Sequence, residues 1–150
     1  MASWKQQALI EAPVEEVWAV ISNPETFPEW NENTVEVTGM PTKVEKGSTY
    51  RETGRTPLGR STTTFEVEEL EDLREIKLRC QTSGYYSHWL LTEARGNTFA
   101  EVELGLEPPN LRAQAFRVTH NKRLLRRMAE GTVDGLRRFV GARAGSRSGS

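Results

Sequence analysis

The segment from Ile10 to Trp30 constrains the fold most strongly, because it changes conformation several times within a short span. A strand ends near Ile10, and Pro13 opens a helix at a position where its missing N–H group costs no hydrogen bond. Pro24 prevents this helix from continuing. A second short helix is expected at 24–29, before a return to strand. One face of the helix expected at 13–22 is apolar and must pack on something: Val14, Val17, Trp18 and Ile21.

The residues of this opening resemble a known family. The pattern Ile10-x-Ala12-Pro13-x-x-Glu16-Val17-Trp18, followed by Pro24, Pro28 and Trp30, is similar to that of the START-like (SRPBCC) superfamily, in particular its polyketide cyclase/dehydrase and lipid-transport branch. The resemblance covers roughly residues 2–141. It implies an α+β helix-grip fold, in which a curved antiparallel sheet wraps round a long C-terminal helix and leaves a ligand cavity between them. The family includes cyclases, dehydratases, carriers and co-chaperone-like regulators, so the resemblance says far more about fold than about function.

The remainder of the chain predicts a seven-stranded antiparallel meander, because short alternating runs are separated by tight turns. Pro108 and Pro109 end the sheet, and Asn110 is a suitable N-cap for a helix that runs to about Gly141. We expect one ligand-binding domain over 1–143 and a flexible tail over 144–150. The expected strands are 3–11, 34–38, 48–55, 60–70, 74–82, 85–93 and 98–107.

Alternation along these strands predicts which side chains face the core. The strand at 85–93 is ambiguous, because its register depends on a turn of unknown length. We favour Trp89 and Leu91 as its inward residues, since two large apolar groups would otherwise face water. On the other strands, the inward residues are expected to be Phe65, Val67, Ile76, Leu78, Cys80, Ala100, Val102, Leu104 and Leu106.

The charge distribution and the cysteine content indicate which partners and which cellular compartment to expect. The net charge is −1, but residues 1–110 hold 10 Lys/Arg and 19 Asp/Glu, whereas residues 111–150 hold 10 and 2. We expect the basic helix to sit against its own acidic sheet and not against nucleic acid, because it lacks interleaved aromatic residues. One cysteine, no secretion signal and no membrane-length apolar run favour a cytoplasmic protein. The oligomeric state stays open, a homodimer included.

Two groups of polar residues are candidates for ligand binding. Gln114 and Asn121 fall within the apolar stripe expected on the long helix, where they either bond a ligand or bond the backbone of the sheet. Glu52 shares a strand face with Tyr50. Glu52 lies in an apolar cavity with a raised pKa if this face points inward. The alternatives are that Tyr50 faces outward, or that Glu52 pairs with a neighbouring arginine such as Arg60. The expected ligand-binding residues are Trp30, Tyr50, Glu52, Phe65, Leu78, Trp89, Leu91, Val102, Gln114, Val118 and Asn121.

No motif in the sequence predicts a cofactor or a metal. His88 and His120 lack partners at metal-ligand spacing, and Cys80 is interpreted as a small buried hydrophobe. Three functions remain. The first is binding of a small hydrophobic or aromatic molecule in the internal cavity. The second is a polyketide cyclase or dehydratase, although no convincing acid–base pair is evident and no catalytic residue is assigned. The third is a protein-interaction module that uses the basic helix.

Overall fold

The computed structural model describes residues 3–56, 59–107 and 122–148. Its elements confirm the predicted order of one strand, two short helical segments, six further strands and a long C-terminal helix. In chain order they are β1 (Ser3–Ile10), α1 (Val14–Ile21), the 3-10 helix η1 (Pro24–Thr26), α2 (Phe27–Trp30), β2 (Thr34–Thr38), β3 (Thr49–Thr56), β4 (Gly59–Glu71), β5 (Glu75–Cys80), β6 (Tyr85–Ala94), β7 (Asn97–Leu106) and α4 (Lys122–Ser148).

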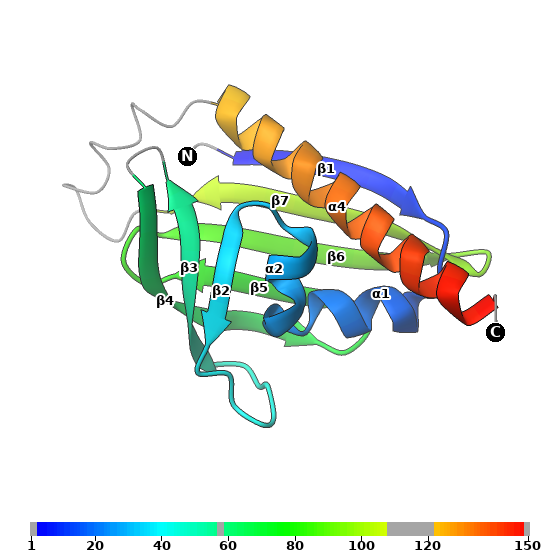
Figure 1. The fold of residues 1–150 in the computed structure, drawn as a ribbon, viewed down its shortest axis with the longest axis horizontal. Helices are drawn as coiled ribbons and strands as arrows, with labels where there is room; N and C mark the ends of the chain where they lie inside the picture. Colours follow the sequence, from blue (N-terminus) through cyan, green and yellow to red (C-terminus); the bar gives the residue numbers. More distant parts are fainter. Residues whose placement is uncertain (1–2, 57–58, 108–121, 149–150) are drawn as a thin grey trace.

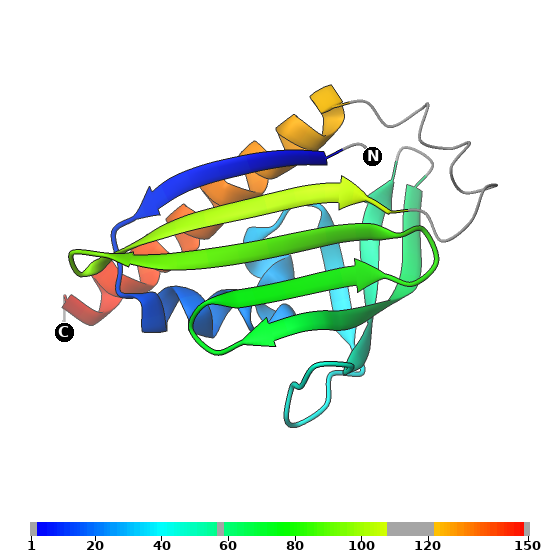
Figure 2. The same cartoon turned by 180° about the vertical axis from the view of Figure 1, so that it is seen from behind.

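The seven strands form one antiparallel sheet in the order β1-β7-β6-β5-β4-β3-β2. Figure 1 shows α4 crossing the concave face of this sheet, with α1 and α2 on the same side. The view from behind shows the convex face with no helix over it (Figure 2). This arrangement confirms the expected α+β helix-grip fold.

The ends of the helices follow from local chemistry. Pro13 precedes the first turn of α1 with an extended backbone, and the side chain of Asn23 accepts a hydrogen bond from the Glu25 N–H at the start of η1. For α4, the expected start at Asn110 lies outside the described residues. Its end at Ser148 lies beyond the predicted end at Gly141, which was therefore wrong. Gly141 is exposed within the helix, and a single glycine weakens a helix without ending it.

The two faces of the sheet differ as alternation predicts. All the side chains that we expected to point inward are buried on the concave side, and Trp89 and Leu91 are among them. The stripe of α4 that covers them is confirmed at Leu125, Ala129 and Leu136. The described part of α4 packs on β1 and β7, so the basic helix does lie against its own sheet. Arg126 pairs with Glu130 of the same helix at 2.8 Å, and a balance between the charges of the helix and those of the sheet stays a prediction.

Two glycines allow α4 to approach α2 closely. A Cβ atom on Gly135 would collide with the backbone carbonyl of Trp30, and one on Gly131 would lie 2.9 Å from the carboxylate of Glu32. The atoms that a Cβ at Gly135 would meet are backbone atoms of Trp30. Backbone atoms cannot move aside by rotation of a side chain. Gly135 therefore sets the distance between the two helices.

We predict that Gly135→Ala lowers the free energy of unfolding by roughly 1–3 kcal/mol, because the new methyl group forces α2 and α4 apart. The matched control is Gly141→Ala on the same helix, where a Cβ meets nothing within 4 Å. That change should raise stability by up to about 1 kcal/mol, the usual gain of alanine over glycine in a helix. Urea titration of both variants measures the difference. Equal effects of the two changes would show that the close approach does not exist in solution.

Candidate functional site

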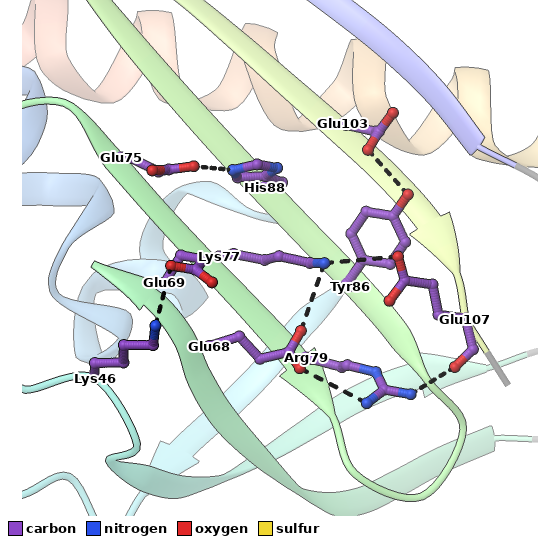
Figure 3. Close-up of polar contacts among 10 residues, drawn as sticks. All are labelled: Lys46, Glu68, Glu69, Glu75, Lys77, Arg79, Tyr86, His88, Glu103 and Glu107. Carbon is purple, nitrogen blue, oxygen red and sulfur yellow. Dashed lines mark hydrogen bonds and ion pairs between the residues drawn. The ribbon is translucent and has the colours of Figure 1, made fainter. Parts of the chain in front are cut away.

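The convex face carries a network of paired charges. Lys77 forms ion pairs with Glu68 at 3.5 Å and with Glu107 at 3.6 Å, and Arg79 lies 3.7 Å from Glu68 (Figure 3). Arg79 also donates to the backbone carbonyl of Glu107 at 2.7 Å. The Nε atom of Arg79 is buried and has no hydrogen-bond partner among the described residues. The other charged groups come from neighbouring strands and pair with one another, so we interpret the network as part of the outer surface.

The remaining polar groups of this face are also paired. His88 lies 2.6 Å from the carboxylate of Glu75, and the hydroxyl of Tyr86 donates to Glu103 at 2.9 Å (Figure 3). His88 therefore has a partner on the convex face, which fits a structural role. The other histidine, His120, lies outside the described residues.

The concave face holds a different group of polar residues, at the end of the sheet where β5 turns into β6. Backbone pairing sets Tyr50 opposite Phe65, Phe65 opposite Cys80, and Glu52 opposite Thr63. Because side chains directly opposite one another share a face, these residues all point into the grip. The concave cluster is defined here as Thr34, Tyr50, Glu52, Thr63, Cys80 and Tyr85.

Tyr50 has a buried hydroxyl without a partner. The side chain is 2% exposed, and its ring stacks on that of Phe65 with centroids 5.7 Å apart. Its hydroxyl oxygen has no hydrogen-bond partner among the described residues. Burial raises the pKa of Tyr50 well above its usual value, and the charges of Glu52, Cys80 and Tyr85 raise it further. The phenol therefore stays protonated and offers an unused hydrogen-bond donor to the interior.

Glu52 is the acidic member of the cluster. Burial raises its pKa from 4.5 to about 7, although a hydrogen bond from Thr34 opposes this effect. Arg60, the alternative partner, is exposed and lies on the opposite face of β4 from Thr63. Glu52 is thus a largely buried carboxyl group that changes charge near neutral pH, as the first of its interpretations requires.

Cys80 and Tyr85 complete the cluster. Burial raises the pKa of the Cys80 thiol, but hydrogen bonds from Ser83, from Thr63 and from the backbone of residues 82 and 83 outweigh it, so the pKa lies below its usual value. Burial, followed by the charge of Glu52, raises the pKa of Tyr85. The sequence analysis did not select Tyr85. Alternation could have found it, because inward Trp89 and Leu91 require inward residues at 85 and 87.

Exposure divides the concave face into two parts. Glu52, Thr63, Tyr85 and Ser87 are partly exposed, although they point into the grip. By contrast, the other predicted binding residues that the structure describes are buried in a packed core: Trp30, Phe65, Leu78, Trp89, Leu91 and Val102. The partly exposed end is therefore where a ligand could reach the interior.

The aromatic residues of α2 close the opposite end. The ring of Trp30 makes edge contacts with those of Phe27 at 5.2 Å and Trp89 at 6.1 Å. Its indole N–H donates to the hydroxyl of Thr26 at 3.1 Å. Trp30 thus has a full set of packing and hydrogen-bond partners within the structure. The three binding residues predicted on the C-terminal helix, Gln114, Val118 and Asn121, lie outside the described residues.

Hollows on the surface lie away from the concave cluster. An open groove of about 430 Å³ lies between the end of α1 and the loop after β2, lined by Asn23, Glu25, Met40 and neighbouring residues. A void of about 20 Å³ separates α1 from Val140 and Arg143. Neither borders Tyr50 or Glu52, so the candidate site rests on the chemistry of its side chains and not on the volume of a hollow.

Metal ligands and membrane-spanning helices are both absent from the described part of the chain. Its residues include no group of three or more His, Cys, Asp or Glu side chains arranged to hold a metal ion. None of the helices in these residues combines the length and the hydropathy needed to cross a bilayer.

We predict that Glu52→Gln stabilises the protein at high pH. Because folding raises the pKa of Glu52, its contribution to stability is fully present below pH 4.5 and is lost as pH rises through about 7. The variant should therefore be more stable than the parent by up to about 3 kcal/mol at pH 8, with little difference at pH 4. Denaturant titrations from pH 4 to pH 8 measure this. Glu36→Gln, at an exposed position of β2, is the control and should show no such trend. A pH-independent difference at Glu52 would mean that the carboxyl is not buried.

The similarity to known proteins supports this fold and covers nearly the whole chain. Residues 1–141 match the model of a family described as polyketide cyclase / dehydrase and lipid transport. A START superfamily protein from Mycobacterium smegmatis superposes with a TM-score of 0.73 at 14% identity, over 95% of this chain and 99% of that one. An AHSA1-like protein from Aeromonas hydrophila superposes with a TM-score of 0.70 at 16% identity, over 95% and 94%.

A protein from Thermus thermophilus is similar in the same way, with a TM-score of 0.72 at 16% identity, over 93% of this chain and 97% of that one. No curated protein sequence matches the chain. The solved structures establish the fold alone, since their identities are low, whereas the family match covers nearly the full length. The resemblance inferred from the sequence is confirmed: the chain belongs to the polyketide cyclase/dehydrase and lipid-transport family.

Proposed function

We propose that this protein binds a small hydrophobic or aromatic molecule between the concave face of the sheet and the C-terminal helix. One observation carries the proposal: the hydroxyl of Tyr50 is buried and has no hydrogen-bond partner among the described residues. A buried polar group without a partner costs about 1–3 kcal/mol. A ligand oxygen at this point would remove that cost, and the family's association with polyketides and lipids supports such an occupant.

The surroundings of Tyr50 suit a ligand that is mostly apolar. Phe65 stacks on its ring, and Leu78 and Leu104 flank Ser87 in the next row of the sheet. Sites of this kind combine apolar walls with a few polar groups that orient the ligand. In the proposed complex, Glu52 and Tyr85 lie at the polar end. Gln114, Val118 and Asn121, which lie outside the described residues, stay part of the proposal.

We predict that filling the open part of the concave face weakens binding. Ser87→Leu adds an apolar side chain between Leu78 and Leu104, which should weaken binding of the uncharged fluorescent probe N-phenyl-1-naphthylamine by about tenfold or more. Thr92→Leu makes the same type of change on the same strand, but at an exposed position of the convex face. It should leave probe affinity unchanged. Probe titration followed by fluorescence, with thermal unfolding to check both variants, measures this.

Two results would count against the proposal. The first is the absence of probe binding to the parent protein. The second is an equal loss of affinity in Ser87→Leu and Thr92→Leu. Native mass spectrometry of freshly purified protein adds an independent test, since a bound small molecule appears as extra mass that denaturation removes.

A second candidate function is catalysis of a cyclisation or dehydration of a polyketide-like substrate. The specific observation in its favour is that Glu52 is buried with a pKa of about 7, which suits a group that gives and takes protons near neutral pH. In a dehydration, Glu52 would remove the proton next to a ketone while Tyr50 donates a hydrogen bond to the carbonyl oxygen. The protonated Glu52 would then return this proton to the β-hydroxyl group, whose C–O bond breaks as it leaves as water.

We predict for this candidate that the protein speeds the dehydration of 4-hydroxy-4-phenylbutan-2-one to the conjugated enone, which is followed by its ultraviolet absorbance. The rate should fall by about 10²–10⁴-fold in Glu52→Gln, as for loss of a general base. The Glu36→Gln variant is the control. A rate equal to that in buffer, or one unchanged by Glu52→Gln, would reject this function and leave the binding proposal intact.

A further inference from the structure

We infer that the concave cluster accepts an uncharged ligand with a carbonyl or hydroxyl oxygen and rejects a carboxylate on the same hydrocarbon skeleton. This inference rests on the proposed function and names the ligand class of the same site. It stands on the placement of two side chains: the unpartnered hydroxyl of Tyr50, and the carboxyl of Glu52 two residues along the same face of β3.

The hydroxyl groups of the concave cluster can donate hydrogen bonds to an acceptor on the ligand. Tyr50 and Tyr85 both face the interior, and burial keeps both phenols protonated at neutral pH. A protonated phenol whose oxygen has no partner satisfies itself by donating to an oxygen of the ligand. Both a neutral carbonyl and a carboxylate could accept this bond, so the hydroxyl groups alone do not discriminate between them.

Glu52 is the residue that distinguishes a carboxylate ligand from an uncharged one. A ligand carboxylate that reached the hydroxyl of Tyr50 would lie beside the largely buried carboxyl group of Glu52, where like charges repel more strongly than in bulk water. The groups that face Glu52 from neighbouring elements are Thr34 on β2, Thr63 on β4, Cys80 on β5 and Tyr85 on β6, together with Tyr50 on its own strand. None of them carries a positive charge.

The nearest cations on these strands point the other way. Arg51 is exposed on the opposite face of β3, and Lys77 and Arg79 are held by Glu68 on the convex face (Figure 3). The described part of α4 packs mainly on β1 and β7, at the other side of the sheet from β3. Within the described residues, a ligand carboxylate at Tyr50 therefore finds no counter-charge.

Three naphthalenes of one skeleton test this inference: 2-ethylnaphthalene without oxygen, the ketone 2-acetylnaphthalene, and 2-naphthoate. Equilibrium dialysis at pH 8 measures the affinity of each, under conditions in which both Glu52 and the naphthoate are ionised. We expect the ketone to bind about tenfold or more tightly than the naphthoate. Tyr50→Phe should weaken binding of the ketone by about 3- to 10-fold and leave that of the hydrocarbon unchanged.

The Glu52→Gln variant isolates the role of the carboxyl. It should strengthen binding of the naphthoate at pH 8 by about tenfold or more and change that of the ketone little. Lowering the pH to 5.5 should have the same effect on the parent protein, because Glu52 becomes protonated while the naphthoate, with a pKa of about 4, stays ionised. In Glu52→Gln this pH dependence should disappear. Tyr86→Phe and Glu36→Gln are the matched controls outside the concave face.

The outcomes separate the inference from the proposed function. If none of the three naphthalenes binds, both are wrong. If the hydrocarbon and the ketone bind but the naphthoate binds equally well at pH 8, or if Glu52→Gln does not improve naphthoate binding, the inference is overturned and the binding function stands. Thermal unfolding shows whether each variant folds, and the Glu52→Gln result decides the matter even if Tyr50→Phe does not fold.

Discussion

The contact between Gly135 and the backbone carbonyl of Trp30 determines how closely helix α4 approaches α2. Any side chain at position 135 would separate these two elements, since the obstacle is backbone. With the distance set, the Trp30 ring packs against Trp89 and Phe27 and closes one end of the grip. Leu125, Ala129 and Leu136 of α4 are then buried over the concave face. The partly exposed polar groups Glu52, Thr63, Tyr85 and Ser87 lie near the turn from β5 to β6.

The two faces of the sheet treat polar groups differently. On the convex face, Lys77, Arg79, His88 and Tyr86 each have a carboxylate partner within hydrogen-bond or ion-pair distance. On the concave face, the hydroxyl of Tyr50 has none among the described residues, and Glu52 is buried at a pKa near 7. Folded proteins rarely leave a buried hydroxyl without a partner, because doing so costs stability. The unpartnered hydroxyl of Tyr50 lies two residues from Glu52 on the largely apolar concave face, and this is the reason for locating function inside the grip.

Much of the fold and part of the candidate site could be predicted from the sequence, because strand alternation and proline placement are local signals. They were sufficient for all seven strands, for the start of α1 after Pro13, and for the inward positions of Tyr50 and Glu52. Tyr85 could have been included by the same alternation. Other features depend on contacts between distant segments. The role of Gly135 requires the position of α2. The raised pKa of Glu52 requires its burial in the folded protein, which Thr34 from another strand partly opposes. The later end of α4 was missed because Gly141 was given the role of a stop, which an exposed helical glycine need not have.

The most direct test of ligand binding inside the grip is to record NOEs between bound 2-acetylnaphthalene and the isotope-labelled protein by NMR. We predict intermolecular NOEs to the rings of Tyr50 and Phe65, which lie side by side on the concave face. The exposed apolar residues Leu9, Leu90 and Phe99 of β1, β6 and β7 serve as an internal control, and they should show none. NOEs confined to those three residues, with none to Tyr50 or Phe65, would place the ligand on the convex face and contradict the account.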